Sequence, residues 1–449
     1  PHNSLESYFG RVNWNVKDRY LFTATVRDDG SSKFGANNRY AVFPSGAFAW
    51  RASEEKFLRN LNVFDDLKLR VSYGRTGNQD IGNYNSLPTL ANNSYNFGDT
   101  KVSGYAPTTL ANPDLRWETT DQFDAGIDLS ILKNRVSVTA DYYNKKTHDL
   151  LLNVPVTSDI GYTTQLQNIG DLQNIGYELA LNTVNLTGKL GWSTSLNLAW
   201  NSNKVTRLGT SGDTIIINPN VPGGVGTGSV INPTVLKVGQ PIDAFYGYVY
   251  QGMVNGEPVY KDLYGLGSSN GVVSSGDQTI IGNAQPLYTG GMTNHFTLGR
   301  FGLTVFLQWS VGNKIYDIQR AILLQNNGTS NYEVDALYDA GKNGVPAPLS
   351  GNLGFQTRPS TLFVEDGTYL RGKNIRFDFN IPPQWLRYTR LTSTNVQLYV
   401  SAQNFFTVTN YKGFDPEVTQ YATNPLAQGI DFGSYPQTRQ FTIGFNAGF

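Results

Sequence analysis

Apolar and polar residues alternate strictly in about thirteen separate segments of this 449-residue chain. The clearest segment is the last one, whose apolar positions are Phe441, Ile443, Phe445, Ala447 and Phe449. Small or polar residues fill the positions between them. Because successive side chains of a β-strand point to opposite faces, this pattern predicts a strand with one apolar and one polar face. Such a strand suits either the edge of a soluble sheet or a membrane barrel, whose apolar face contacts lipid.

The other segments recur along the whole chain and decide between these alternatives. They lie near residues 8–16, 20–26, 42–50, 67–73, 123–131, 136–142, 177–181, 192–200, 288–297, 303–309, 375–381 and 396–402. Most approach the roughly ten residues with which a tilted strand spans a bilayer. The charged residues of these segments occupy the polar positions of the alternation. They are Arg70, Asp128, Asp141, Glu178, Arg376 and Asp378. A charge facing lipid at mid-membrane costs about 2–4 kcal/mol, so we expect these side chains to face a lumen.

In the segment 192–200 this reasoning assigns a side to each residue. We expect Leu196, Leu198 and Trp200 to face lipid, and Ser195 and Asn197 to face the lumen. Aromatic residues also stand near the segment ends, where the girdles of membrane barrels lie. These are Tyr20, Tyr142, Trp192, Trp200, Trp309 and Trp385.

The connections between segments fall into two classes. Short ones are Lys17-Asp18, Lys133-Asn134, 187–189, 299–302 and 382–394, the last with room for a helical turn. Long ones cover about residues 75–118, 145–174, 201–286, 313–369 and 407–435. Long irregular loops are unusual in compact soluble domains but typical of outer-membrane barrels, whose periplasmic turns are short. The sequence therefore predicts an all-β, transmembrane, antiparallel β-barrel with short periplasmic turns and long extracellular loops.

Composition excludes several other classes. The 35 Lys and Arg residues balance 35 Asp and Glu residues, which argues against a nucleic-acid partner. There is no cysteine, and His2, His148 and His295 are not in metal-ligand spacing. The adjacent Asp65 and Asp66 suit a solvated turn better than an acid–base pair. With no nucleophile–base constellation visible, we predict no enzyme and no catalytic, cofactor-binding or metal site.

Several long stretches carry a resemblance to one family. They include YFGRVNWNVKDRYLFTATVRDDG from Tyr8, LKLRVSYGRTGNQDIGNY from Leu67, NPDLRWETTDQFDAGIDLS from Asn112, IGDLQNIGYELALNT from Ile169, TIIGNAQPLYTGGMTN from Thr279, LFVEDGTYLRGKNI from Leu362 and SAQNFFTVTNYKGFDPEV from Ser401. In this order they resemble the carboxy-terminal half of the SusC/RagA-type TonB-dependent transporters of the Bacteroidetes outer membrane. The resemblance extends from the start of the chain to its end.

The resemblance implies an activity and partners that the alternation does not. Members are 22-stranded barrels with an amino-terminal plug, and they import oligosaccharides or oligopeptides with energy delivered through TonB. A surface lipoprotein of the SusD type acts as their lid. The chain is accordingly expected to be a multi-pass protein of the Gram-negative outer membrane, in contact with lipid. A non-energised outer-membrane pore or a surface adhesin barrel is the alternative.

The strand count implies a particular part of such a receptor. We expect residues 1–449 to be the carboxy-terminal portion of one barrel domain, with the plug, the TonB-contacting segment and about nine first strands lying outside this sequence. An odd number of antiparallel strands cannot close on itself, because the first and last strands run the same way. Tyr8 and Phe445 should therefore lie on the two free edges of the sheet.

Two sets of residues are candidates for function. The expected assembly signal lies at the aromatic chain end and consists of Phe441, Ile443, Phe445 and Phe449. The expected partner or substrate surface lies in the loop before the last strand and consists of Asn410, Tyr411, Phe414 and Asp415. Many relatives carry an acidic, calcium-loop-like stretch before the IGNAQP segment. Here residues 261–270 contain Asp262 alone, with Asp277 further on, so we predict no calcium site.

Overall fold

A computed structural model provides the fold. It describes residues 2–209 apart from 157, 158, 160 and 163, then 214–216, 233–254, 257–263, 273–324, 334, 338, 358–386, 395–418 and 426–448. The chain divides into two compact units. The first comprises residues 1–177 and 203–215, and the second comprises residues 178–202 and 216–449.

Thirteen antiparallel strands form the main sheet, as the alternation predicts. In pairing order they are β1 (Leu5–Val16), β2 (Tyr20–Ser31), β3 (Tyr40–Arg51), β4 (Phe64–Asn78), β7 (Glu118–Ile131), β8 (Val136–His148), β11 (Asp171–Leu186), β12 (Leu190–Arg207), β19 (Tyr288–Leu298), β20 (Phe301–Val311), β23 (Tyr369–Asn380), β24 (Asn395–Thr409) and β26 (Gln440–Gly448). Each predicted segment corresponds to one of these strands. β1, which holds Tyr8, and β26, which holds Phe445, stand at the two ends of the order and do not pair with each other.

The connections contain more regular structure than the sequence indicates. Their strands are β5 (Thr89–Phe97), β6 (Thr100–Thr109), β9 (Leu151–Pro155), β10 (Thr164–Asn168), β13 (Thr214–Ile216), β14 (Thr234–Lys237), β15 (Ala244–Gly247), β16 (Tyr250–Val254), β17 (Glu257–Tyr260), β18 (Thr279–Asn283), β21 (Lys314–Asp317), β22 (Val364–Asp366) and β25 (Ile430–Asp431). The α-helices are α1 (Lys56–Arg59), α2 (Ile318–Leu323) and α4 (Pro383–Leu386). The single turns of 3₁₀-helix are η1 (Ala36–Asn38), η2 (Ala52–Glu54), η4 (Ser275–Asp277) and η5 (Thr361–Phe363). None of the helices described is long and apolar enough to cross a membrane.

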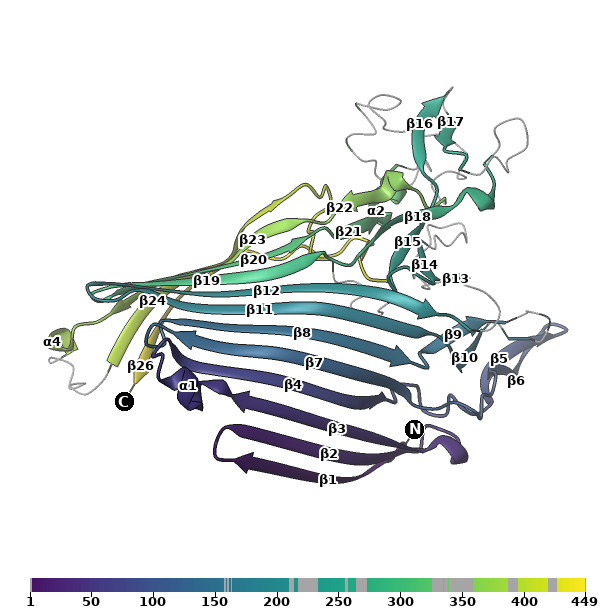
Figure 1. Cartoon of the computed structure of the whole chain (residues 1–449). Coiled ribbons are helices and arrows are strands. Elements are labelled where there is room, and N and C mark those ends of the chain that lie inside the picture. The colour runs from purple at the N-terminus through teal and green to yellow at the C-terminus, as the bar shows by residue number, and fades with distance from the viewer. Residues whose placement is uncertain are drawn as a thin grey trace. The chain divides into compact units, whose positions relative to one another are not determined.

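Within each unit, the short turns lie at one end of the strands and the long connections lie at the other end (Figure 1). In the first unit the β1–β2 and β7–β8 turns lie at one end, and the β5–β6 hairpin lies at the other. In the second unit the β11–β12 and β19–β20 turns lie opposite α2, β21 and β22. The expected helical turn in residues 382–394 is α4. The predicted pattern of short periplasmic turns and long extracellular loops is confirmed.

One face of the first unit is continuously apolar because the strand register aligns its large side chains. Trp14 pairs with Phe22, Phe22 pairs with Phe48, and Phe48 pairs with Val71 in four successive strands. The rings of Trp14 and Phe22 lie 5.7 Å apart, and those of Phe22 and Phe48 lie 4.9 Å apart. This face has the composition that contact with lipid requires.

The opposite face of the first unit carries paired charges. Arg70 donates to Asp128 through Nε at 2.9 Å and to Asp141 through Nη2 at 2.9 Å. Gly126 stands between Arg70 and Asp141 in the register, and a Cβ built on it would lie 2.2 Å from the Asp141 carboxylate. The missing side chain therefore leaves the space in which arginine reaches across β7. These residues share the polar face, as predicted.

The second unit shows the same separation of faces. Leu196 pairs with Met292 and Leu198 with Gly290, whereas Ser195 donates a hydrogen bond to Asn182 at 2.7 Å from the other face. Strand register therefore places Leu198 and Asn197 on opposite sides of the sheet, as the alternation predicts. Arg376 and Asp378 also pair, at 2.7 Å.

Candidate functional site

The extracellular loops of the second unit share a small core of their own. β21 pairs antiparallel with β22 and parallel with β25, which joins the connection after β20 to the connection after β24. Eight buried residues pack together there, namely Phe245, Tyr316, Ile318, Ala321, Leu324, Phe363, Ala427 and Ile430. A core of this kind holds the ends of three long connections in one place.

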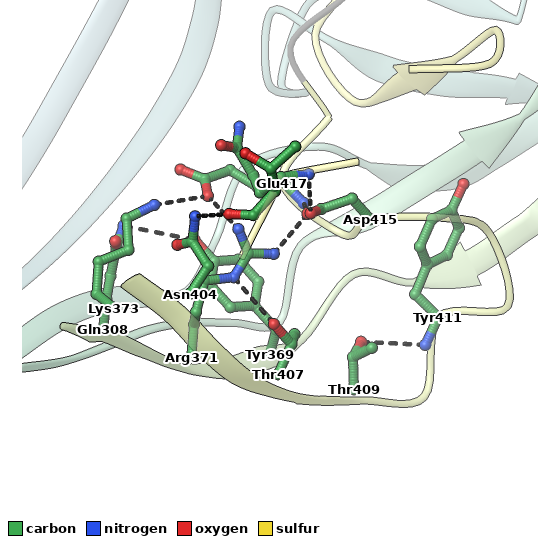
Figure 2. A network of polar contacts seen from close by, with 12 residues as sticks. Gln308, Tyr369, Arg371, Lys373, Asn404, Thr407, Thr409, Tyr411, Asp415 and Glu417 are labelled. Atoms are coloured by element: carbon green, nitrogen blue, oxygen red, sulfur yellow. Dashed lines mark hydrogen bonds and ion pairs between the residues drawn. The ribbon is translucent and has the colours of Figure 1, made fainter. Parts of the chain in front are cut away.

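A buried arginine fastens the β24–β26 connection to the top of β23. The Arg371 side chain is 1% exposed and donates to Asp415 at 2.5 Å, to Glu417 at 2.8 Å and to the Thr407 hydroxyl at 3.1 Å (Figure 2). Lys373 adds a second cation to Glu417 at 3.0 Å. A buried charge is tolerated only when it is paired and hydrogen-bonded, so this network fixes the path of the loop.

A second buried polar group lies beside the loop core. The Tyr411 hydroxyl donates to Asp431 at 2.6 Å, and Asp317 accepts the backbone N–H of Arg320 at 2.8 Å. Burial and the neighbouring charges of Glu365 and Asp431 raise the pKa of Asp317 to about 7. Burial also raises the pKa of Tyr411, together with the charge of Asp317 and the hydrogen bond to Asp431. Asp317 is therefore a group whose protonation changes near neutral pH.

A pocket of about 540 Å³ opens between these loops. Its lining includes the polar or charged residues Tyr250, Gln251, Arg320, Thr361, Glu365, Asp366, Asn410 and Lys412. Arg320 donates to Glu365 at 3.4 Å, and Glu365 also accepts the backbone N–H of Lys412 at 2.9 Å. Burial favours the neutral form of Asp366, but hydrogen bonds from Thr368 and the nearby Lys314 leave its pKa lowered overall. The pocket thus presents fixed charges of both signs.

The four predicted loop residues occupy different positions around this site. Tyr411 and Asp415 are each 5% exposed and hold the loop in place. Asn410 is exposed and lines the pocket, and Phe414 is 74% exposed. Asn410 and Phe414 are therefore the two members of the set that another molecule can reach. Their role in binding stays a prediction.

Sequence reasoning missed the residues that organise the site, above all Arg371, Arg320 and Asp317. One signal was available for Arg371, which shares the parity of the apolar residues Ile375 and Phe377 in its own strand. A β-bulge at Gly372–Asn374 shifts the register by one residue, so Ile375 pairs with Val305 whereas Arg371 pairs with Gln308 on the other face. Arg320 gave no such signal because its side chain binds Leu362 and Glu365, which are distant in the sequence, and Asp317 gave none because its burial and the charges of Glu365 and Asp431 also come from distant segments.

The predicted assembly residues lie on one face of β26. Phe441, Ile443 and Phe445 are 78%, 83% and 70% exposed, and Phe449 lies outside the described residues. Residues 264–270 of the stretch considered for calcium also lie outside them. Within the described part of the chain, no group of three or more potential ligand side chains could hold a metal ion.

Comparison with known proteins points to one family. Residues 1–294 match the model of the TonB-dependent receptor-like β-barrel. TonB-dependent receptor P3 of Formosa agariphila is 37% identical over 99% of this chain, and TonB-dependent receptor SusC of Bacteroides thetaiotaomicron is 33% identical over all of it. The solved RagAB peptide transporter covers 99% of the chain with a TM-score of 0.83 and 27% identity. The chain spans about 45% of the length of these relatives.

Proposed function

The chain belongs to the TonB-dependent receptor β-barrels of the outer membrane, and from this premise we propose that it forms the carboxy-terminal part of an importer of nutrient oligomers. In this proposal the plug and the remaining strands come from the rest of the receptor. A SusD-type lipoprotein covers the loops, and TonB supplies energy through the amino-terminal part. The cargo is an oligosaccharide or an oligopeptide.

The observation that carries this proposal is the ordered construction of the extracellular loops. Three long connections share one buried core, and the β24–β26 connection is also held to β23 by the buried ion pair of Arg371 with Asp415. Ordering chain costs about 1–2 kcal/mol per residue in backbone entropy, which a loop without a binding role has no need to offset. A rigid scaffold that presents a pocket at its surface is how proteins position binding residues on loops.

The pocket lining favours an oligopeptide over a neutral sugar. Glu365, Asp366 and Lys412 place charges of both signs around one space of about 540 Å³. A peptide carries an amino and a carboxylate terminus, and charge-assisted hydrogen bonds to such groups are roughly twice as strong as neutral ones. The RagAB relative is described as a peptide transporter, which agrees with this assignment.

Uptake by cells that make the full-length receptor tests the proposal. Labelled oligopeptides should accumulate only when TonB is present, and Lys412→Gln should reduce their uptake. Lys189→Gln, in the short β11–β12 turn, is the matched control and should have no effect. Uptake that persists without TonB would instead support a passive pore. TonB-dependent uptake of neutral oligosaccharides alone would refute the peptide assignment and leave the importer intact.

Co-isolation of the lipoprotein tests the partner surface separately. Phe414 is 74% exposed in the β24–β26 connection, and aromatic side chains are enriched at the core of protein interfaces. Phe414→Ala should lower the amount of lipoprotein recovered with the receptor. Trp385→Ala removes an aromatic residue of similar exposure from the connection between β23 and β24, and recovery should stay unchanged. Equal recovery with both variants would contradict a role for Phe414 in docking.

A further inference from the structure

A row of charged residues lies at or just beyond the extracellular ends of strands in the first unit, where Arg75, Asp121, Lys146 and His148 continue the parity of the apolar residues in their strands. We call it the outer charged belt, and it consists of Arg75, Arg116, Asp121, Lys146, His148, Asp149, Asp171 and Arg207. In β4, Arg75 lies on the same face as Tyr73. Arg75 pairs with Asp121 of β7, and Tyr73 pairs with Phe123. The belt therefore begins on the same face of the sheet as the apolar residues, directly above them.

Three arginines of the belt are held in the same way. Nε and Nη2 of Arg75 donate to Asp121 at 2.7 and 2.8 Å, those of Arg116 to Asp149 at 3.0 and 2.7 Å, and those of Arg207 to Asp171 at 2.8 and 3.1 Å. Each carboxylate thus occupies one edge of its guanidinium group. No described residue accepts a hydrogen bond from Nη1 of these arginines. Each arginine is therefore fixed in position with donors left over.

Two further residues complete the belt. His148 lies 3.8 Å from Asp121 and 3.5 Å from Asp171, so it stands between the Arg75 and Arg207 pairs. Lys146 is exposed and directly opposite Asp121 in the register, and its ammonium group has no ion pair with a described residue. Four permanent cations face three carboxylates in the belt. The arginine side chains are 43–59% exposed while the carboxylates are 16–23% exposed, so the surface presented outward is cationic.

The depth of the belt follows from the length of the apolar face beneath it. From Ile131 at the periplasmic end of β7 to Phe123 the strand rises about 26 Å. At the usual tilt of roughly 40° this is about 20 Å of height, close to the apolar band of a membrane barrel. Phe123, Tyr142 and Tyr177 lie side by side at its upper limit, with ring centroids 6.5 and 5.2 Å apart. These rings have the position of an aromatic girdle, and the belt starts two residues above them, at the Arg75–Asp121 pair.

We propose that the outer charged belt binds the phosphate-bearing headgroup of a glycolipid of the outer leaflet. Guanidinium groups match phosphate geometry, and basic groups at the membrane surface attract anionic headgroups. The half-buried aspartates hold the arginines in position, and Lys146 supplies the excess charge. The neighbouring girdle would contact the upper acyl chain of the same lipid.

Lipid retention by the purified full-length receptor tests this site. The receptor is placed in phosphatidylcholine nanodiscs, and lipopolysaccharide, dephosphorylated lipopolysaccharide or inorganic phosphate is added. Lipopolysaccharide should be retained and should raise the apparent melting temperature. Replacing Arg75, Arg116 and Arg207 together by Gln should abolish both effects. Arg27→Gln, which removes an exposed arginine from its ion pair with Asp29 on the opposite face of the same sheet, is the matched control and should preserve both.

Lys146→Gln gives a second variant that breaks no contact needed for folding. It should weaken retention about fivefold, the effect of one basic residue near an anionic surface. Full retention by the triple Gln variant, or equal retention of the dephosphorylated lipid, would overturn the proposal. A shift in melting temperature with inorganic phosphate alone would overturn the assignment to a lipid headgroup.

Discussion

At the scale of single residues, two properties decide what a side chain does in this protein: the face it occupies and its depth along the strand. Arg70 and Arg75 belong to one strand and both form ion pairs with aspartates of β7. Arg70 lies on the polar face, where the lumen tolerates its charge, whereas Arg75 shares the parity of Tyr73. The expectation that charged residues of the strands face the lumen is correct for Arg70. It says nothing about Arg75, because a charge on the apolar side is costly only at hydrocarbon depth.

The face assignment predicts a contrast between adjacent residues of β12. Leu198→Arg should sharply reduce the amount of folded receptor in the outer membrane, because the charge would face lipid at a cost of about 2–4 kcal/mol. Asn197→Arg should be tolerated, because its neighbours on that face are polar. The measurement is the fraction of heat-modifiable receptor in purified outer membranes. Similar losses for both variants would show that the assigned faces are wrong.

The buried carboxyl of Asp317 predicts a pH dependence of the loop core. Its pKa in the folded chain is about 7, above the value of 3.8 for an unperturbed carboxyl, so the folded state binds the proton more tightly. Its contribution to stability is therefore fully present at low pH and is lost as pH rises towards about 7. Asp317→Asn should remove the gain in apparent melting temperature between about pH 8 and about pH 6.

Asp366→Asn is the matched control for this measurement. The pKa of Asp366 is lowered, so this carboxyl contributes stability above its ordinary pKa and loses it only on stronger acidification. The variant should therefore keep the gain between about pH 8 and about pH 6. Loss of the gain in Asp366→Asn, or its persistence in Asp317→Asn, would assign the effect to another group.

At the scale of elements, the sequence predicts what short-range periodicity determines. All thirteen main strands follow from alternation, because one buried or lipid-facing side imposes a period of two. Their ends are less predictable: β11 runs from Asp171 to Leu186, well beyond the alternating core at residues 177–181. The strands β21, β22 and β25 could not be predicted, because residues far apart in the sequence stabilise them. The same reason hides the partners of Arg371.

The buried ion pairs of Arg371 predict how the β24–β26 connection responds to mutation. Arg371→Met leaves Asp415 buried without its cation, and removing one partner of a buried pair typically costs about 3–5 kcal/mol. Proteases should then cleave the connection much faster in the full-length receptor, with little change in the strands. Lys373→Gln removes a partly exposed cation from Glu417 and should have a much smaller effect. Equal cleavage of both variants would show that Arg371 does not fasten the loop.

At the scale of the whole molecule, the described strands form a sheet whose order begins at β1 and ends at β26. The chain spans about 45% of its relatives, and we propose that the other strands of the receptor pair with these two edges. Unpaired backbone groups in hydrocarbon cost several kcal/mol each, so the barrel gains its stability only as a complete assembly.

The proposed assembly signal acts at this scale as well. Phe441, Ile443 and Phe445 present a highly exposed apolar face on β26, and Phe449 continues their parity. Deleting Phe449 from the full-length receptor should lower the amount of folded barrel in the outer membrane, measured by heat modifiability. Replacing the polar-parity Asn446 by Ser is the control and should have no effect. Unchanged levels after the deletion would restrict Phe449 to a structural role.

The glycine at position 126 has a consequence for how this receptor's sequence can diverge. Arg70 reaches Asp141 only because β7 offers no side chain between them. Any larger residue at position 126 would separate the two charges, and Asp141 would then stand on the lumen face without its partner, whereas Arg70 would keep its pair with Asp128. The three positions should therefore covary: in homologues that replace the glycine, the arginine or the second aspartate should be replaced as well. An alignment in which position 126 varies freely while both charges persist would contradict this coupling.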